Sequence, residues 1–134
     1  MRSAIVVLLV GCDVATGDPA ALLAERAPDA TDCGAASSFG EPTPAGARAC
    51  ALAARGRGEG FRVVVDRAVA DGRDAVGWIG DAAGPGGWRL DYLAVYGTFG
   101  GDTEDVSWQA CAAIDVLPPD CGTLDGDLCL RCRD

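Results

Sequence analysis

Seven cysteines are the residues of this chain with the widest chemical options, because a thiol can form a disulfide, bind a metal or carry a covalent group. An odd count in an exported protein implies that one cysteine has a separate role. The other six can then form three disulfides. Cys33 precedes a predicted helix that contains Cys50, so this pair is favoured. The remaining pairing stays open among Cys111, Cys121, Cys129 and Cys132, and the seventh cysteine is Cys12.

Cys129 and Cys132 form a CxxC motif. Redox-active motifs of this kind stand at a helix N-terminus, whose dipole lowers the thiol pKa. This motif instead lies in a C-terminal tail with no βαβ pattern beside it. Four thiolates, from Cys111, Cys121, Cys129 and Cys132, would suffice for a structural zinc site. The long first spacing between them favours structural disulfides, so we predict no metal and no cofactor.

Catalytic chemistry has few residues to use. The chain contains no histidine, which removes the imidazole base of Ser-His-Asp and Cys-His sites. Carboxylates cluster in predicted turns and are interpreted as solvated, because the loop around Asp125 and Asp127 lacks the other ligands of an EF-hand. The other two clusters are Asp71/Asp74 and Asp102/Glu104/Asp105. We therefore predict no catalytic residues and a protein that is not an enzyme, with a carboxylate-dependent hydrolase as the least favoured alternative.

The composition is that of an acidic chain whose core contains few large apolar side chains. Of 134 residues, 49% are hydrophobic, but much of that share is alanine, which removes little apolar area from water. Disulfides are the usual supplement for small exported domains. The net charge of −9 argues against nucleic acid as a partner, since phosphates require a basic face.

The first twelve residues predict the location of the protein. Arg2 is followed by an apolar run from Ala4 to Val10 and then by Gly11, a pattern typical of an export signal. The ending Leu9-Val10-Gly11-Cys12 resembles the lipobox of bacterial lipoproteins. This resemblance implies cleavage before Cys12, a diacylglyceryl group on the Cys12 thiol, and a lipid-anchored location in the bacterial cell envelope. The inner or outer membrane stays undecided, and a buried strand is the alternative interpretation of the apolar run.

These signals divide the chain into three parts. Residues 1–11 are the predicted signal peptide, residues 12–32 the lipidated cysteine and a flexible tether, and residues 33–134 a single small disulfide-bonded domain. Within the tether, Asp18-Pro19 predicts the start of a short, weakly held helix. In the domain, Thr43-Pro44 starts a helix over residues 45–55. Its small side chains share one face that permits close approach to a sheet: Ala47, Cys50, Ala51 and Ala54.

A period of two begins at Phe61 and predicts strands near residues 61–70, 75–79, 88–96 and 106–117. Short connections between them favour an antiparallel meander. The predicted fold class is α+β: one small-faced helix packed on a four-stranded antiparallel meander sheet, disulfide-stabilised. The tail from Asp120 has few large apolar groups, so disulfides are expected to hold it.

A binding role is the prediction that these arguments leave. The expected function is a membrane-anchored, non-enzymatic binding or interaction module, with a purely structural envelope protein as the alternative. Its expected partners are the lipid bilayer, through acyl chains, and an envelope protein or extracellular ligand. Exposed aromatic side chains on the strands would favour a partner, and buried ones the structural role. The residues concerned are Trp78, Trp88, Tyr92, Tyr96 and Trp108.

Overall fold

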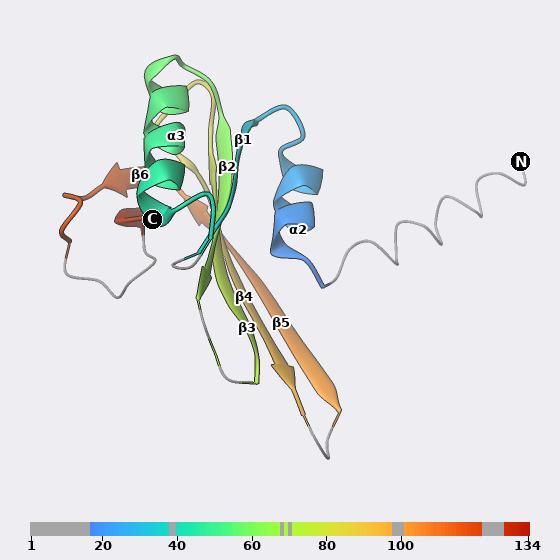
Figure 1. The fold of residues 1–134 in the computed structure, drawn as a ribbon. Helices are drawn as coiled ribbons and strands as arrows, with labels where there is room; N and C mark the ends of the chain where they lie inside the picture. Colours follow the sequence, from blue (N-terminus) through green and yellow to red (C-terminus); the bar gives the residue numbers. More distant parts are fainter. Residues whose placement is uncertain (1–16, 38–39, 68, 70, 98–100, 122–127) are drawn as a thin grey trace, which may run out of the picture.

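The structure is a computed structural model that describes residues 17–37, 40–67, 69, 71–97, 101–121 and 128–134. Cys12 and the predicted signal peptide lie outside the described residues, as do Asp125 and Asp127. The described part is a mixed α/β fold with a five-stranded sheet, one helix on each of its faces and a small two-stranded sheet (Figure 1). None of its helices is long and apolar enough to cross a membrane.

The five-stranded sheet runs in the order β1-β2-β3-β4-β5. Strand β1 pairs parallel with β2, and the other neighbours pair antiparallel. A parallel pair needs a crossover connection, and α3 (Pro44–Gly56) supplies it. The strands are β1 (Thr31–Ala36), β2 (Phe61–Arg67), β3 (Gly72–Gly80), β4 (Gly87–Tyr96) and β5 (Asp102–Cys111).

Helix α3 packs on one face of β1 and β2. Its predicted small-residue face is confirmed, because Ala47, Ala51 and Ala54 are fully buried. The helix begins as expected, with the Thr43 hydroxyl accepting from the Gly46 N–H at 3.1 Å. The short side chains allow close approach to the larger Phe61 of β2 in the same core.

Helix α2 (Pro19–Arg26) packs on the opposite face, against β2, β3 and β4. Its Leu23 is 1% exposed and belongs to a second core with Ile79 and Leu90. The helix covers the face to which Trp88, Leu90, Tyr92 and Ala94 of β4 contribute. The sheet is therefore covered on both faces, but by helices that lie over different strands.

The C-terminal segment forms a two-stranded sheet from β6 (Ala113–Val116) and β7 (Leu130–Arg133). Two arginines of α3 hold it by donating to main-chain carbonyls. Arg48 donates to the Leu128 and Leu117 oxygens, both at 2.8 Å, and Arg55 donates to the Ile114 oxygen at 2.7 Å. These charge-assisted hydrogen bonds supply binding energy that the alanine-rich helix face lacks.

The structure corrects the predicted fold in three places. The sheet has five strands, one of them parallel, in place of four antiparallel strands. The fourth predicted strand is divided at Ala112, after which β6 leaves the main sheet for β7. Residues 19–32 of the predicted tether pack as α2 and the start of β1, so the folded domain includes chain before Cys33. The tail is held by disulfides as expected, but it also contributes buried Leu128 and Leu130.

Candidate ligand-binding surface

The five aromatic residues predicted as a surface divide into three groups. Trp78 and Tyr92 are buried, at 2% and 3% exposure, and belong to opposite cores. Tyr96 is 55% exposed at the end of β4. Trp88 and Trp108 are half-buried and lie together, with ring centroids 6.3 Å apart and planes at 90°. The structure thus brings together only two of the five as partly accessible aromatic rings.

Arg26, at the C-terminal end of α2, contacts both of these indoles. Its guanidinium carbon lies 4.2 Å from the Trp88 ring centroid and 4.1 Å from that of Trp108. Both distances are within the range of a cation–π interaction. Sequence reasoning missed Arg26, because its contact depends on how α2 docks. The only available signal was its place in the last turn of a helix whose Leu22 and Leu23 are apolar.

A surface hollow of about 320 Å³ lies beside this cluster and is lined by Leu22, Glu25, Arg26 and Trp108. A second hollow, of about 300 Å³, lies on the loop that follows α2 and also includes Arg26. Each is lined by apolar and charged residues together and is open to solvent. Neither is lined by a serine or cysteine nucleophile.

The β3–β4–β5 hairpins extend away from α3, and their ends reach beyond α2 (Figure 1). We call residues 72–76, 91–96 and 102–107 the β arm; on its α2 face, Ala75, Tyr92 and Ala94 are buried in the core with Leu23. Four of its large apolar side chains are exposed by 39–55%: Leu93, Val95, Tyr96 and Val106. Leu93 and Val95 lie on the face that α3 leaves open, because they alternate along β4 with Tyr92 and Ala94, which are buried on the α2 face.

Charges on and beside the arm are distributed unequally. On the β2–β3 side, Arg73 contacts Asp66 at 2.8 Å, and this hydrogen bond is the main cause of the raised pKa of Arg73. On β4, Arg89 contacts Asp91 at 3.0 Å. Along β5, the acids have no arginine partner among the described residues: Asp102, Glu104 and Asp105. The outer strand therefore carries uncompensated negative charge.

Glu104 instead accepts a hydrogen bond of 2.7 Å from the Tyr92 hydroxyl. Burial of Tyr92 raises its pKa to about 12, and the hydrogen bond and charge of Glu104 add to the effect. The phenol therefore stays protonated and holds Glu104 against the α2 face of the sheet.

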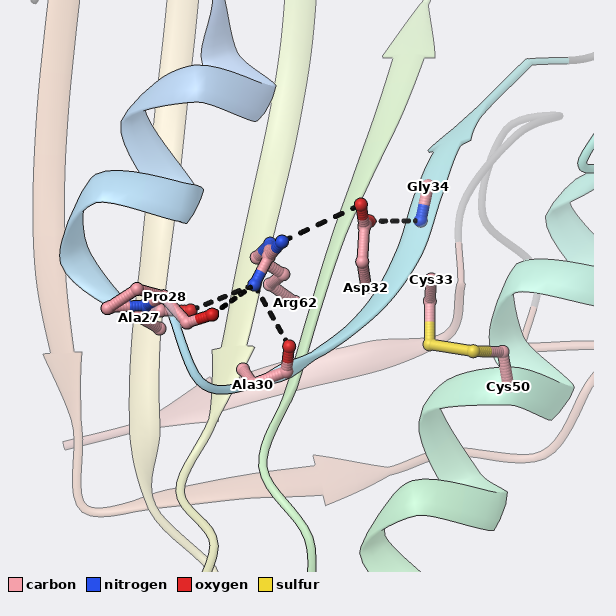
Figure 2. A network of polar contacts seen from close by, with 8 residues as sticks. All are labelled: Ala27, Pro28, Ala30, Asp32, Cys33, Gly34, Cys50 and Arg62. Carbon is pink, nitrogen blue, oxygen red and sulfur yellow. Dashed lines mark hydrogen bonds and ion pairs between the residues drawn. A yellow bond between two sulfur atoms is a disulfide. The ribbon is translucent and has the colours of Figure 1, made fainter.

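A separate polar network surrounds Arg62 and is structural (Figure 2). One guanidinium nitrogen donates to the Ala27, Pro28 and Ala30 carbonyls at 3.0, 3.2 and 2.9 Å. The other nitrogen lies 3.6 Å from Asp32, whose carboxylate also accepts from the Gly34 N–H. Because these donors are used to attach the α2–β1 loop to β2, Arg62 is not available for a ligand.

The cysteines form three disulfides: Cys33–Cys50, Cys111–Cys132 and Cys121–Cys129. The first is the pair that the sequence favoured, and it joins β1 to α3 (Figure 2). Cys129 and Cys132 bond to different partners, so the CxxC motif does not act as a dithiol in this fold. Within the described ranges, no three potential metal ligands are grouped.

Comparisons with known proteins give no relative from which a role could be inferred. No protein-family model matches the chain, no curated protein sequence shows significant similarity, and no solved structure matches significantly.

Proposed function

We propose that this protein is a non-enzymatic binding module, anchored to the bacterial cell envelope through a lipidated Cys12. The lipobox resemblance of Leu9-Val10-Gly11-Cys12 supports the anchor. The three disulfides fit a protein that folds in an oxidising compartment. An acidic surface repels anionic lipid, so the acyl chains would supply the membrane contact.

The observation that carries the binding role is the exposure of apolar side chains on the β arm. Leu93 and Val95 lie side by side on the α3 face of the sheet, at strands that α3 does not cover, while the exposed Tyr96 and Val106 lie on the opposite face. Grouped apolar side chains on a small acidic domain favour contact with a partner, because burial would remove their area from water. Isolated exposed residues would carry no such argument.

The alternative is a purely structural envelope protein. The burial of Trp78 and Tyr92 supports this alternative, because a buried side chain cannot contact a ligand. A carboxylate-dependent hydrolase has the weakest support, since Asp105 and Asp102 are exposed on an open strand rather than converging in a cleft.

The anchor is tested by the intact mass of protein purified from the native membrane fraction, before and after reduction and alkylation. We expect a chain that begins at Cys12 with acyl groups attached, and six thiols that alkylate only after reduction. A chain that retains Met1, with thiols that alkylate freely, would overturn the proposed anchor and compartment together.

The binding role is tested by a photo-cross-linking amino acid placed at Leu93 in the native host. The matched control carries the same group at Ala53, an exposed position on α3. A discrete adduct from Leu93 and none from Ala53 supports a partner on the β arm. Equal labelling from both positions, or no adduct from Leu93, favours the structural alternative.

A further inference from the structure

Among the described residues, β5 is an edge strand of the main sheet. It pairs with β4 along its whole length, from Asp102 to Cys111, and no other described strand of the main sheet lies beyond it. An open edge presents main-chain donors and acceptors that an added strand can satisfy. The side chains and charges along this edge then decide what can be added.

The direction of the main-chain groups follows from one hydrogen bond. The Tyr96 N–H donates to the Asp71 carbonyl at 2.8 Å, so Tyr96 faces β3. In an antiparallel strand the main-chain groups of successive residues alternate in direction. Leu93 and Val95 therefore face β5, and their partners Asp105 and Thr103 face back toward them.

By the same alternation, the N–H and C=O groups of Glu104, Val106 and Trp108 point away from the sheet. The carbonyl of Ala110 agrees with this assignment, because it lies 3.9 Å from the Cys132 sulfur of β7, outside the β4–β5 pair. A sixth strand beside residues 104–108 would thus meet three outward-facing residues.

The surface next to this edge suits alternate side chains of an added strand. Trp108 lines the hollow of about 320 Å³ together with Leu22, Glu25 and Arg26 of α2. A residue opposite Trp108 would reach this hollow, and a residue opposite Val106 would cover a side chain that is 39% exposed. Main-chain pairing supplies affinity in this mode of recognition, while pockets for alternate side chains supply specificity.

The negative charge of this edge favours a positively charged partner. Asp102, Glu104 and Asp105 have no cationic partner within the described part of the chain. A strand with lysine or arginine would complement them, and like charges directly opposite are unfavourable. A second copy of this chain would bring the same carboxylates and a net charge of −9, so self-association at this edge is opposed.

We propose that the outer edge of β5 binds a basic, extended segment of an envelope protein, which adds as a sixth strand. Its cations lie opposite Asp105 on one face, and on the other face, which carries Glu104, an apolar side chain enters the hollow beside Trp108. This inference rests on the proposed binding function and names the chemistry of its partner.

The test uses the oxidised, folded protein and a capped seven-residue peptide that alternates arginine and valine. Its counterpart carries glutamate for arginine, and a third version has N-methylated valines, which keep the charge but cannot pair through the main chain. We expect the first peptide to bind, the glutamate peptide not to bind, and N-methylation to weaken binding by about tenfold or more. If the N-methylated peptide binds as tightly as the unmodified arginine peptide, binding is nonspecific charge attraction without main-chain pairing, and the proposal is overturned.

Two variants locate the site on the protein. Val106→Pro removes an outward N–H, and proline is tolerated at such an edge position, so the variant should fold and lose peptide binding. Glu104→Gln with Asp105→Asn should weaken binding by about fivefold or more at low salt. Asp120→Asn, an exposed acid of the C-terminal segment, is the matched control and should bind normally. Undiminished binding by folded Val106→Pro contradicts the proposal.

Two outcomes distinguish failure of the β5-edge proposal from failure of the proposed binding function. If cross-links from Leu93 persist in the Val106→Pro background, the binding module stands and the β5 edge is not its site. If sedimentation detects a dimer that Val106→Pro abolishes, the edge binds a second copy, and the basic partner is excluded.

Discussion

Leu23 of α2 packs directly on Gly77 of β3, at a point where the sheet has no side chain. A Cβ added to Gly77 would lie 3.0 Å from both Leu23 methyl carbons. Leu23 is 1% exposed and is the large buried side chain by which α2 attaches to the sheet. Docking of α2, and with it the position of Arg26, therefore depends on the absence of a side chain at residue 77.

Gly77→Ala should lower the free energy of unfolding by about 1–3 kcal/mol, because overpacking forces Leu23 to move. Leu23→Ala should lower it by about 2–5 kcal/mol through the cavity it leaves. Urea denaturation of the double variant should give a loss smaller than the sum, since the two residues share one contact. Gly84→Ala is the control, because a Cβ there meets nothing within 4 Å. Strict additivity would contradict the contact.

Arg62→Ala should lower the free energy of unfolding by about 2–3 kcal/mol, because three main-chain carbonyls lose a charged donor. The Arg62 side chain is only 17% exposed, so water replaces the guanidinium poorly. Arg57→Ala is the matched control: its ion pair with Glu59 is exposed on both sides, and no measurable loss is expected. Equal effects in thermal denaturation would contradict the structural role of Arg62.

Arg26→Ala should alter tryptophan fluorescence, because two of the three tryptophans, Trp88 and Trp108, lose the guanidinium that covers them. Red-shifted emission and a stability loss of about 1 kcal/mol are expected. Arg26→Lys keeps the charge but not the planar stacking group, so it should restore the spectrum only in part. An unchanged spectrum in Arg26→Ala would show that the cation does not cover the indoles in solution.

Alkaline titration should report on Tyr92. Its pKa rises from 10 to about 12 on folding, so the unfolded chain releases the phenol proton first. This contribution to stability is complete below pH 10 and is lost as the pH rises to about 12. Absorbance of the Tyr96→Phe variant, which retains Tyr92 alone, should show one phenol ionising near pH 12. Glu104→Gln should move that ionisation to lower pH; an unmoved value would contradict the hydrogen bond.

Local sequence signals predicted the elements that depend on local chemistry. Thr43-Pro44 starts α3, its small residues face the sheet, and the period of two after Phe61 locates β2 and β4 closely. Strand β1 was missed because Thr31–Ala36 lacks both bulky β-formers and alternation. Its conformation is instead supported by parallel pairing with β2 and by the Cys33 disulfide.

The candidate site was predictable only in part, because it depends on contacts between residues that are distant in the sequence. Trp88 and Trp108 were identified from the strands that contain them, but Arg26 lies in a segment interpreted as a tether. Its contact requires Leu23 to fit over Gly77, and such complementarity between distant residues leaves no pattern in either local segment. The open edge of β5 likewise follows from strand order and not from composition.

The β1–α3–β2 unit also has a consequence for the order in which the chain can fold. Residues 31–67 are contiguous and contain a parallel strand pair, its crossover helix and a complete disulfide. A chain that emerges N-terminus first can therefore close the ring between Cys33 and Cys50 before any later cysteine has appeared. Early closure leaves only Cys111, Cys121, Cys129 and Cys132 to choose partners, which reduces the number of possible disulfide pairings from fifteen to three.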